Sequence, residues 1–232
     1  MSGTRVAVII ASYGRPAELA QLLQRLAVQS LQPVQVVLAV CDRNDAPRDL
    51  PVGLDVEIVV AKQGLSAQRN AGLRAVGPCD YVAFFDDDYV PSRRAIEGIV
   101  GGFGAFPDLA GLNGWLLADG INGPGISHAE AVRKVEEFDA AWTPRPPSHR
   151  SRDLIGLYGC NMAFRWTAID GSEFDEKLPL YAWQEDVDFA SRIRKAGGMA
   201  RTDAFHGVHR GVKNGRTSGY RFGYSQVVNP LY

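Results

Sequence analysis

The chain has 232 residues, of which 46% are hydrophobic and 22% charged, and its formal net charge is -1. This length suits one large domain, and the composition is that of an ordinary globular protein. A nearly neutral chain has no overall basic field, so nucleic acid is not expected as a partner. The three cysteines are widely spaced and odd in number. They predict neither a disulfide framework nor a cysteine metal site, and they favour a reducing compartment.

No apolar stretch reaches the roughly 18 residues of a membrane span, and the first residues lack a signal-peptide pattern. We therefore expect a cytoplasmic protein, with the inner face of the membrane as an alternative location. The chain ends without an obvious closing element, so we expect a longer natural protein. Peripheral membrane association through a region absent from this chain is left open.

In the first half of the chain, short apolar runs alternate with helical patterns. A helix is predicted after Pro16, where four leucines recur at helical spacing, and a second over 64–76. Strands are predicted at 6–11, 34–40, 56–61 and 81–85. This alternation predicts parallel βαβ units and an α/β fold.

The second half is less regular. A helix is predicted near 129–142, and another begins near Glu185 and stops at Gly197. Strands are predicted at 112–118 and 199–205. The segment 143–153 is rich in proline and arginine, which indicates an exposed loop. The glycine-rich run at 98–104 does not follow a strand, so it does not qualify as a dinucleotide-binding loop.

Polar residues gather after three predicted strands, at 12–15, 42–45 and 86–88. Ligands of open α/β sheets bind beyond the carboxyl ends of the strands, so these clusters predict a site along one edge. Three adjacent aspartates repel one another unless a cation is present, and hard divalent cations prefer carboxylate oxygens. Because side chains alternate along an extended chain, we expect Asp86 and Asp88 on one side and Asp87 on the other.

One interpretation of the aspartates is a phosphatase of the haloacid-dehalogenase type. Residues 86–90 (Asp-Asp-Asp-Tyr-Val) fit the Asp-x-Asp-x-Thr/Val pattern of that class. That motif ends the first strand of its fold, whereas three predicted strands precede it here. This argues against the phosphatase interpretation.

Several motifs, in order along the chain, resemble those of the family 2 glycosyltransferases of the GT-A fold. The stretch 8–15 is similar to their opening strand and nucleotide loop. Residues 64–72 (Gly-Leu-Ser-Ala-Gln-Arg-Asn-Ala-Gly) are similar to their Gly-x-x-x-Ala-Arg-Asn-x-Gly signature, with Gln68 in place of the alanine before the arginine. Residues 84–88 are similar to their Asp-x-Asp motif. Three stretches match their acceptor-side landmarks: 159–164, 174–176 and 185–189.

The resemblance implies a GT-A fold with a Rossmann-like, mostly parallel central sheet, flanking helices and a smaller acceptor-side subdomain. Residues 1–110 would be the nucleotide-sugar-binding half and residues 111–232 the acceptor-binding half of one domain. The implied reaction is an inverting, metal-dependent transfer from a nucleotide diphosphate sugar, with UDP-sugar favoured, in polysaccharide or glycoconjugate synthesis. The implied acceptor is a carbohydrate or a lipid-linked molecule.

The same resemblance implies roles for single residues. Inversion needs a base that deprotonates the acceptor hydroxyl, and this role falls to Asp186, with Glu185 beside it. The departing phosphates need their charge neutralised by Mn²⁺ or Mg²⁺, held by Asp88 and Asp86 with His209 as a further ligand. His206 is a weaker candidate. The implied nucleotide-sugar contacts are Ser12, Tyr13, Arg15, Asp42, Arg69, Asp86 and Asp87.

Each role has a structural alternative. Acidic residues at 185–188 also suit a helix N-terminus, and Asp42 also suits a turn. Two other functions remain open: a sugar-phosphate nucleotidyltransferase, which normally has a Gly-x-Gly-Thr-Arg loop after its first strand, and a non-catalytic nucleotide- or carbohydrate-binding module. The basic, glycine-rich segment from Arg210 to Gly219 is predicted to fold over a diphosphate when nucleotide binds.

Overall fold

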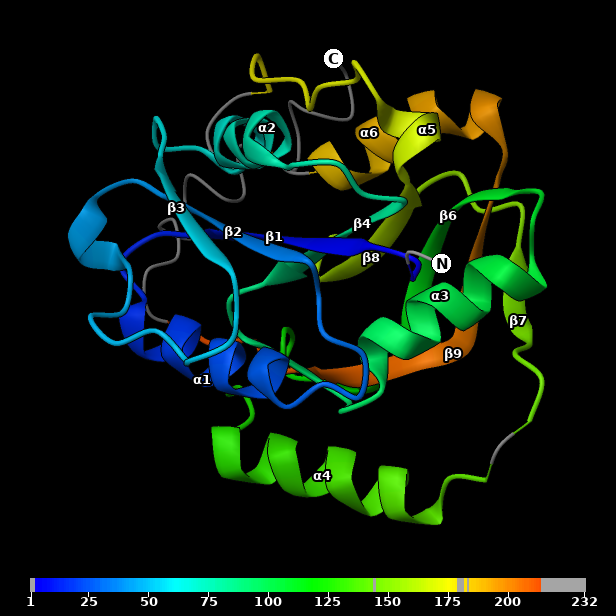
Figure 1. Cartoon of the computed structure of the whole chain (residues 1–232), viewed down its shortest axis with the longest axis horizontal. Helices are drawn as coiled ribbons and strands as arrows, with labels where there is room; N and C mark the ends of the chain where they lie inside the picture. Colours follow the sequence, from blue (N-terminus) through cyan, green and yellow to red (C-terminus); the bar gives the residue numbers. More distant parts are fainter. Residues whose placement is uncertain (1–2, 144, 179–181, 183, 214–232) are drawn as a thin grey trace.

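We describe the protein from a computed structural model, in which residues 3–143, 145–178, 182 and 184–213 are described. Within these residues, no helix is long and apolar enough to cross a membrane. A nine-stranded sheet with the order β3-β2-β1-β4-β8-β6-β9-β5 forms the centre of the molecule, and β7 pairs with β9 at its side (Figure 1).

The first half of the sheet is parallel, as predicted. β1 (Val6–Ser12) lies between β2 (Gln35–Val40) and β4 (Tyr81–Asp86), and β3 (Val56–Val60) forms the edge. The register places Ser12 opposite the last residue of β2, and Ala11 opposite Asp86. The carboxyl ends of the three inner strands therefore meet at one edge, which brings the polar residues after them together.

The second half of the sheet mixes directions. β8 (Asn161–Arg165) is antiparallel to β4 and to β6 (Leu109–Asp119), so β6 runs in the direction of β4. β9 (Gly198–His209) is parallel to β6 and antiparallel to β5 (Tyr89–Pro91). The expectation of a mostly parallel α/β sheet is confirmed, with β5, β7 and β8 as its antiparallel members.

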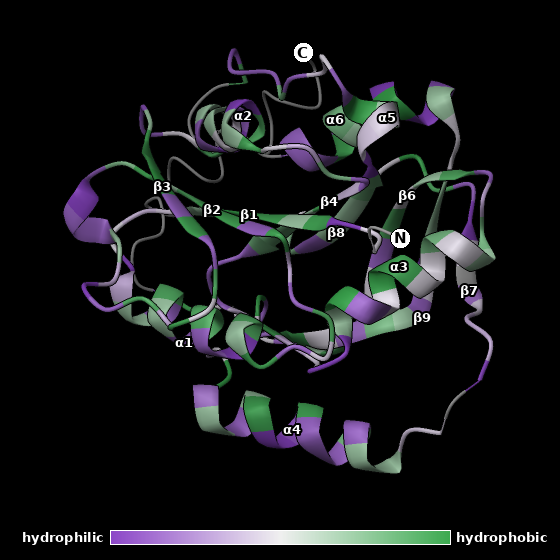
Figure 2. Ribbon diagram, in the orientation of Figure 1, coloured by the Kyte–Doolittle hydropathy of each residue, from purple (hydrophilic) through white to green (hydrophobic). Residues whose placement is uncertain are grey.

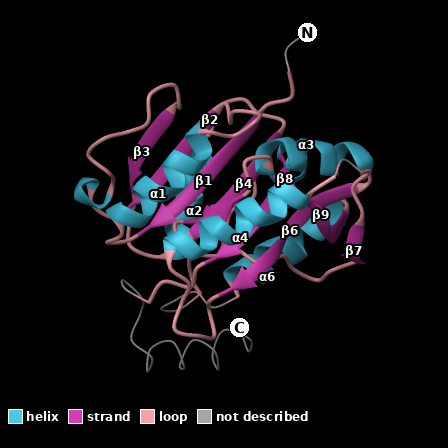
Figure 3. Cartoon of the chain, turned by 90° about the horizontal axis from the view of Figure 1, so that it is seen from below, coloured by secondary structure: helices cyan, strands magenta, loops and turns pink. Residues whose placement is uncertain are grey.

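Helices cover both faces of the sheet. α2 (Leu65–Ala75), α5 (Trp166–Ile169) and α6 (Glu185–Ile193) lie on one side in Figure 1. α1 (Pro16–Ala27), α3 (Ala95–Ala105) and α4 (His128–Ala141) lie on the other, in front of the sheet in Figure 3. The four leucines of α1 are buried against Val6, Val8 and Ile10 of β1, which explains their helical spacing. The outermost helix, α4, mixes hydrophilic and hydrophobic residues along its length (Figure 2).

One prediction for a single element was wrong, and one helix was missed. The loop predicted at 143–153 contains β7 (His149–Arg152), which pairs with β9, so the polar sequence hid an edge strand. The glycine-rich run at 98–104 lies within α3, a helix that was not predicted. A Cβ atom at Gly98 would lie 2.1 Å from the carbonyl oxygen of Ala204, so this glycine lets the helix approach β9 closely. Close packing against β9, rather than helix propensity, therefore explains the glycine at position 98.

Candidate active site

The three aspartates divide by their partners as the strand pattern predicts, since Asp87 faces Ser12 and Arg15 whereas Asp86 and Asp88 face His209. Asp86 is partly exposed at the end of β4, whereas Asp87 and Asp88 are buried. Asp87 accepts hydrogen bonds from Ser12 Oγ at 2.6 Å and from Arg15 Nη1 at 2.8 Å. Burial raises the pKa of Asp87 to about 6, and Arg15 opposes that rise. Asp87 thus fastens the loop after β1, and a direct contact between Asp87 and a nucleotide stays a prediction.

Asp86, Asp88 and His209 form a group that has the geometry to hold a metal ion. One ligand atom from each lies within 4.8 Å of the others. His209 Nε2 lies 3.3 Å from Asp88 Oδ1 and 3.8 Å from Asp86 Oδ2. Two carboxylates and one imidazole are a donor set that suits Mn²⁺. These are the three residues predicted from the sequence, brought together from β4, the turn after it and the end of β9.

Asp119 and Tyr158 orient the ring of His209, and neither was predicted from the sequence as part of the site. His209 Nδ1 lies 2.9 Å from Asp119 Oδ1 and 3.3 Å from the Tyr158 hydroxyl, which turns Nε2 toward the aspartates. Such a partner behind a histidine fixes its ring orientation and strengthens it as a ligand. Burial alone would lower the pKa of His209, but its carboxylate partners raise it to about 10.

Asp88 is 2% exposed. Burial would raise its pKa, but the bond to His209 and the amide of Val212 hold the pKa below its ordinary value. Val212 N donates to Asp88 Oδ2 at 2.7 Å, and Arg15 Nη2 donates to the Val212 carbonyl at 3.2 Å. The chain after β9 therefore lies against the aspartates. The rest of the predicted glycine-rich closing segment, from residue 214, lies outside the described residues.

His206 is not a metal ligand in this arrangement. Its Nε2 lies 2.6 Å from Asp139 Oδ1 of α4. Residues three apart in an extended strand face opposite sides, so His206 and His209 of β9 cannot share an ion. The prediction of His206 as a weaker metal-ligand candidate is therefore wrong. Its contact with Asp139 instead connects α4 to the sheet.

Arg69 connects the two acidic motifs. Its guanidinium is almost fully buried, and it donates to Glu185 Oε1 at 2.5 Å and to Asp86 Oδ1 at 3.3 Å. It also donates to the carbonyl of Gly159 at 3.1 Å. The expected contact with a nucleotide stays a prediction. What the geometry establishes is a buried cation between Asp86 on β4 and Glu185 at the start of α6.

The acidic pair at the start of α6 lies beside this arginine. Asp186 accepts two backbone hydrogen bonds, from Gly159 N at 2.7 Å and from Val187 N at 2.8 Å. Burial raises the pKa of Asp186, while Arg69 opposes the rise. Burial and the neighbouring Asp186 raise the pKa of Glu185 to about 8. Burial thus makes both carboxylates stronger bases than ordinary ones. A Cβ atom at Gly159 would lie 2.8 Å from Arg69 Nη2, so a glycine is needed there.

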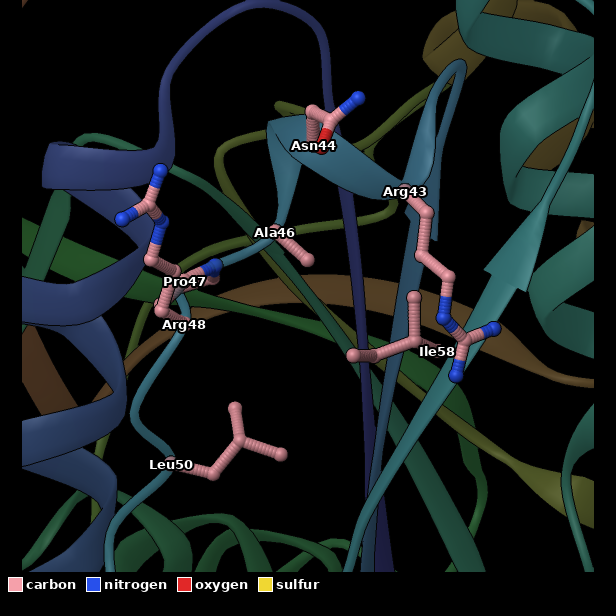
Figure 4. A pocket seen from close by; sticks show the side chains of 7 residues that line it. All are labelled: Arg43, Asn44, Ala46, Pro47, Arg48, Leu50 and Ile58. Carbon is pink, nitrogen blue, oxygen red and sulfur yellow. The ribbon is translucent and has the colours of Figure 1, made fainter.

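Asp42 and Tyr13 lie at the outer end of the sheet edge. Asp42 is exposed and caps the short helix η1 (Arg43–Asp45), accepting a hydrogen bond from Asn44 N at 2.8 Å. Tyr13 is 47% exposed. A cavity of about 280 Å³ is lined by residues that follow Asp42 in the sequence. Arg43 and Ile58 lie on one side of this cavity and Pro47 lies on the other (Figure 4). None of the predicted site residues lines it.

Two further residues of the 64–72 motif are structural. Gln68 is buried and donates to the carbonyls of Ser12 and Ala39, at 2.7 and 2.8 Å, which ties β1 to β2. Asn70 donates to Phe174 O and Glu176 Oε1 and accepts from Phe174 N. The side-chain amides of this motif therefore connect α2 to β1 and β2 on one side and to the segment 174–176 on the other.

Comparison with known proteins agrees with this geometry. Residues 7–114 match the family described as Glycosyl transferase family 2. A search of curated proteins found no match. Among solved structures, S. aureus TarS 1–349 in complex with UDP-GlcNAc is 16% identical with a TM-score of 0.60. That alignment covers 98% of this chain and 66% of TarS 1–349.

Two other solved structures have the same fold. The mannosyltransferase PcManGT from Pyrobaculum calidifontis, in complex with GDP-Man and Mn²⁺, is 16% identical with a TM-score of 0.59, covering 91% of this chain and 58% of that one. Glucosyl-3-phosphoglycerate synthase from Mycobacterium tuberculosis, in complex with Mn²⁺, UDP and glucosyl-3-phosphoglycerate, is 15% identical with a TM-score of 0.59, covering 99% and 79%. The chain spans 60% of the TarS 1–349 structure without ligand. At these identities the likeness shows the fold, which is the predicted GT-A fold.

Proposed function

Because residues 7–114 match glycosyl transferase family 2, we propose that the protein transfers a sugar from a nucleotide diphosphate sugar to an acceptor hydroxyl, with inversion at the anomeric carbon. The observation that carries this proposal is the joining of two acidic centres by Arg69. On one side lies the metal-capable group of Asp86, Asp88 and His209, and on the other lies the pair Glu185 and Asp186.

The metal-capable group is the donor centre of the proposed reaction. Asp86, Asp88 and His209 would hold Mn²⁺ or Mg²⁺, which when bound neutralises the charge that develops on the departing diphosphate. Ser12, Tyr13, Arg15 and Asp42 line the same sheet edge and would contact the nucleotide. UDP is the favoured nucleotide, and UDP, UDP-GlcNAc and GDP-Man in the related structures support a nucleotide sugar in general.

Asp186 is the proposed base. The amides of Gly159 and Val187 fix its carboxylate, and its raised pKa makes it a stronger base than an ordinary aspartate. It would take the proton of the acceptor hydroxyl as that oxygen attacks the anomeric carbon from the face opposite the nucleotide. Glu185 is held by Arg69 and would keep Asp186 in place. Residues 1–110 and 111–232 would then serve donor and acceptor respectively.

Asp88→Asn and Asp186→Asn separate the two roles. We expect both changes to lower the transfer rate about 100-fold or more. Asp88→Asn should also abolish the effect of Mn²⁺ on UDP binding, whereas Asp186→Asn should leave UDP affinity nearly unchanged. Calorimetry with UDP, and transfer assays over a panel of nucleotide sugars, measure both. Full transfer activity in Asp186→Asn contradicts the base assignment, and binding of no nucleotide sugar contradicts the proposed function.

A further inference from the structure

A second cavity lies at the beginning of α2, the helix that carries Arg69. Its volume is about 230 Å³. Its walls come from the segment 62–67, which leads into α2, and from the segment 176–178 with Ala182, which leads toward α6. In Figure 1 the yellow segment that follows α5 lies above α2. Ser66 lies three residues before Arg69, so the two share one face of the helix, one turn apart.

The α2 end of this cavity is built to receive an anion. Gly64 precedes the helix, and no side chain caps the terminus. The first backbone N–H groups of a helix have no partner within it, and together with the helix dipole they attract negative charge. Lys62 and Lys177 line the same cavity, and in the described part of the chain neither ammonium group forms an ion pair.

Ser66 supplies an independent indication of a ligand. This residue lines the cavity and is only 3% exposed, yet its hydroxyl has no hydrogen-bond partner among the described residues. A buried hydroxyl without a partner costs free energy, so native proteins rarely keep one without a reason. The acidic member of the lining, Glu176, is already engaged as an acceptor for Asn70. The lining holds two lysines and one carboxylate, so its net charge is positive.

We propose that this cavity binds a phosphate group of the acceptor substrate. The inference rests on the proposed transfer reaction and names its acceptor class, a phosphorylated molecule. The donor diphosphate is expected at Asp86, Asp88 and His209, whereas one wall of this cavity is formed by residues 176–178 and by Ala182, which precede Asp186 in the sequence. A phosphate bound at α2 would place the rest of a short acceptor toward the base. Two lysines and a helix N-terminus match the two charges of a phosphate monoester better than the single charge of a carboxylate.

Inorganic phosphate is the probe, titrated into the intact protein by calorimetry or NMR, with acetate as the comparison anion. We expect phosphate to bind more tightly than acetate. We also expect it to bind with little change when UDP and Mn²⁺ are already saturating. Loss of phosphate binding on addition of UDP would place the anion in the donor site and overturn the assignment. Acetate binding as tightly as phosphate would overturn the choice of phosphate.

Ser66→Ala is the sharpest variant. It should weaken phosphate binding about fivefold, the effect of one hydrogen bond. Because alanine favours the helix and removes an unpartnered hydroxyl, the melting temperature should stay the same or rise. Lys62→Met should weaken phosphate about tenfold, while Lys195→Met, an exposed lysine outside the cavity, should have no effect. Unchanged phosphate affinity in Ser66→Ala and Lys62→Met overturns the proposal. UDP binding is measured in the same variants, so failure of the donor site is seen separately.

Discussion

Arg69 is the residue on which the site depends most at the scale of single side chains. It is buried with Glu185 and lies between that carboxyl and Asp86. Removing a carboxyl partner of a buried guanidinium is costly because the charge of the arginine is left with less compensation. A buried arginine with three acceptors is also rigid, which holds the two acidic centres at a fixed separation. Side chains that act on a substrate need such rigid neighbours, because small displacements of reacting groups weaken a site.

The raised pKa of Glu185 predicts a specific dependence of stability on pH. The pKa rises from 4.5 to about 8 on folding, so between these values the native state holds a proton that the unfolded state has lost. The free energy of unfolding should therefore fall as pH rises from 4.5 toward 8. Glu185→Gln should remove this slope, with a difference on the order of 2–4 kcal/mol across the range. Urea unfolding in EDTA at several pH values measures it.

Glu137→Gln is the control for that experiment. Glu137 is an exposed residue of α4 whose partner is Arg133 on the same helix. Exposed pairs contribute little to stability, so this variant should keep the pH profile of the wild type. Identical profiles for Glu185→Gln and the wild type would show that Glu185 titrates normally in the folded protein.

The residues of the site were predictable to different degrees. The aspartate triplet stands out because it places titratable groups at the end of an apolar run, whereas His209 and the pair at 185–186 were assigned through the resemblance to family 2 glycosyltransferases. Asp119 and Tyr158 were not predictable, because each is one polar residue in an ordinary segment and acts only through its contact with His209. Asp139 was missed for the same reason, since its role depends on His206 from a distant strand.

At the scale of elements, α3 shows how packing overrides local preference. Its glycines at 98 and 102 face β6 and β9, where a Cβ atom would meet Ala204 and Leu112. Gly101 faces open space. Strands β1 to β4 were predictable as short continuous apolar runs, and α1 by the helical spacing of its leucines. Helix α3 was missed although Ile96, Ile99 and Phe103 recur at helical spacing, because glycines, which disfavour a helix, interrupt that pattern.

Gly98→Ala and Gly101→Ala test this explanation as a matched pair. A methyl group at position 98 meets a backbone carbonyl, so Gly98→Ala should lower the free energy of unfolding by about 3 kcal/mol. Gly101→Ala meets nothing within 4 Å and should raise it by up to about 1 kcal/mol. Chemical denaturation of both variants gives the comparison. Equal effects would mean that α3 does not approach β9 as closely as described.

Strand β7 illustrates a different limit at the same scale. Its sequence is wholly polar, and an edge strand with one neighbour needs no apolar face. Proline-rich flanks and charged residues therefore predicted a loop, while pairing with β9 made the segment extended. Hydrophobic patterns predict strands that are at least partly buried. The strand β7 has no such pattern, and only its pairing with β9 identifies it as a strand.

At the scale of the whole molecule, metal and nucleotide should stabilise the fold together. Because a ligand that binds only the native state raises stability by mass action, UDP at about 100 times its Kd adds about 2.7 kcal/mol. For a chain of this size that corresponds to about 5–10 °C in Tm. We expect this shift with UDP and Mn²⁺ together, and a much smaller one with UDP and EDTA. A Tm shift of the same size with UDP and Mn²⁺ as with UDP and EDTA would argue against Asp86, Asp88 and His209 as metal ligands.

The position of β9 has a consequence for how the protein is made. This strand fills the place between β6 and β5 and carries His209 at its end. Its partners lie far earlier in the sequence, and such long-range pairing forms slowly. During synthesis the first four strands leave the ribosome well before β9 does. A nascent chain can therefore assemble the sheet edge that carries Asp86 and Asp88 early, yet it gains His209, the third member of the metal-capable group, only when β9 has been translated and inserted.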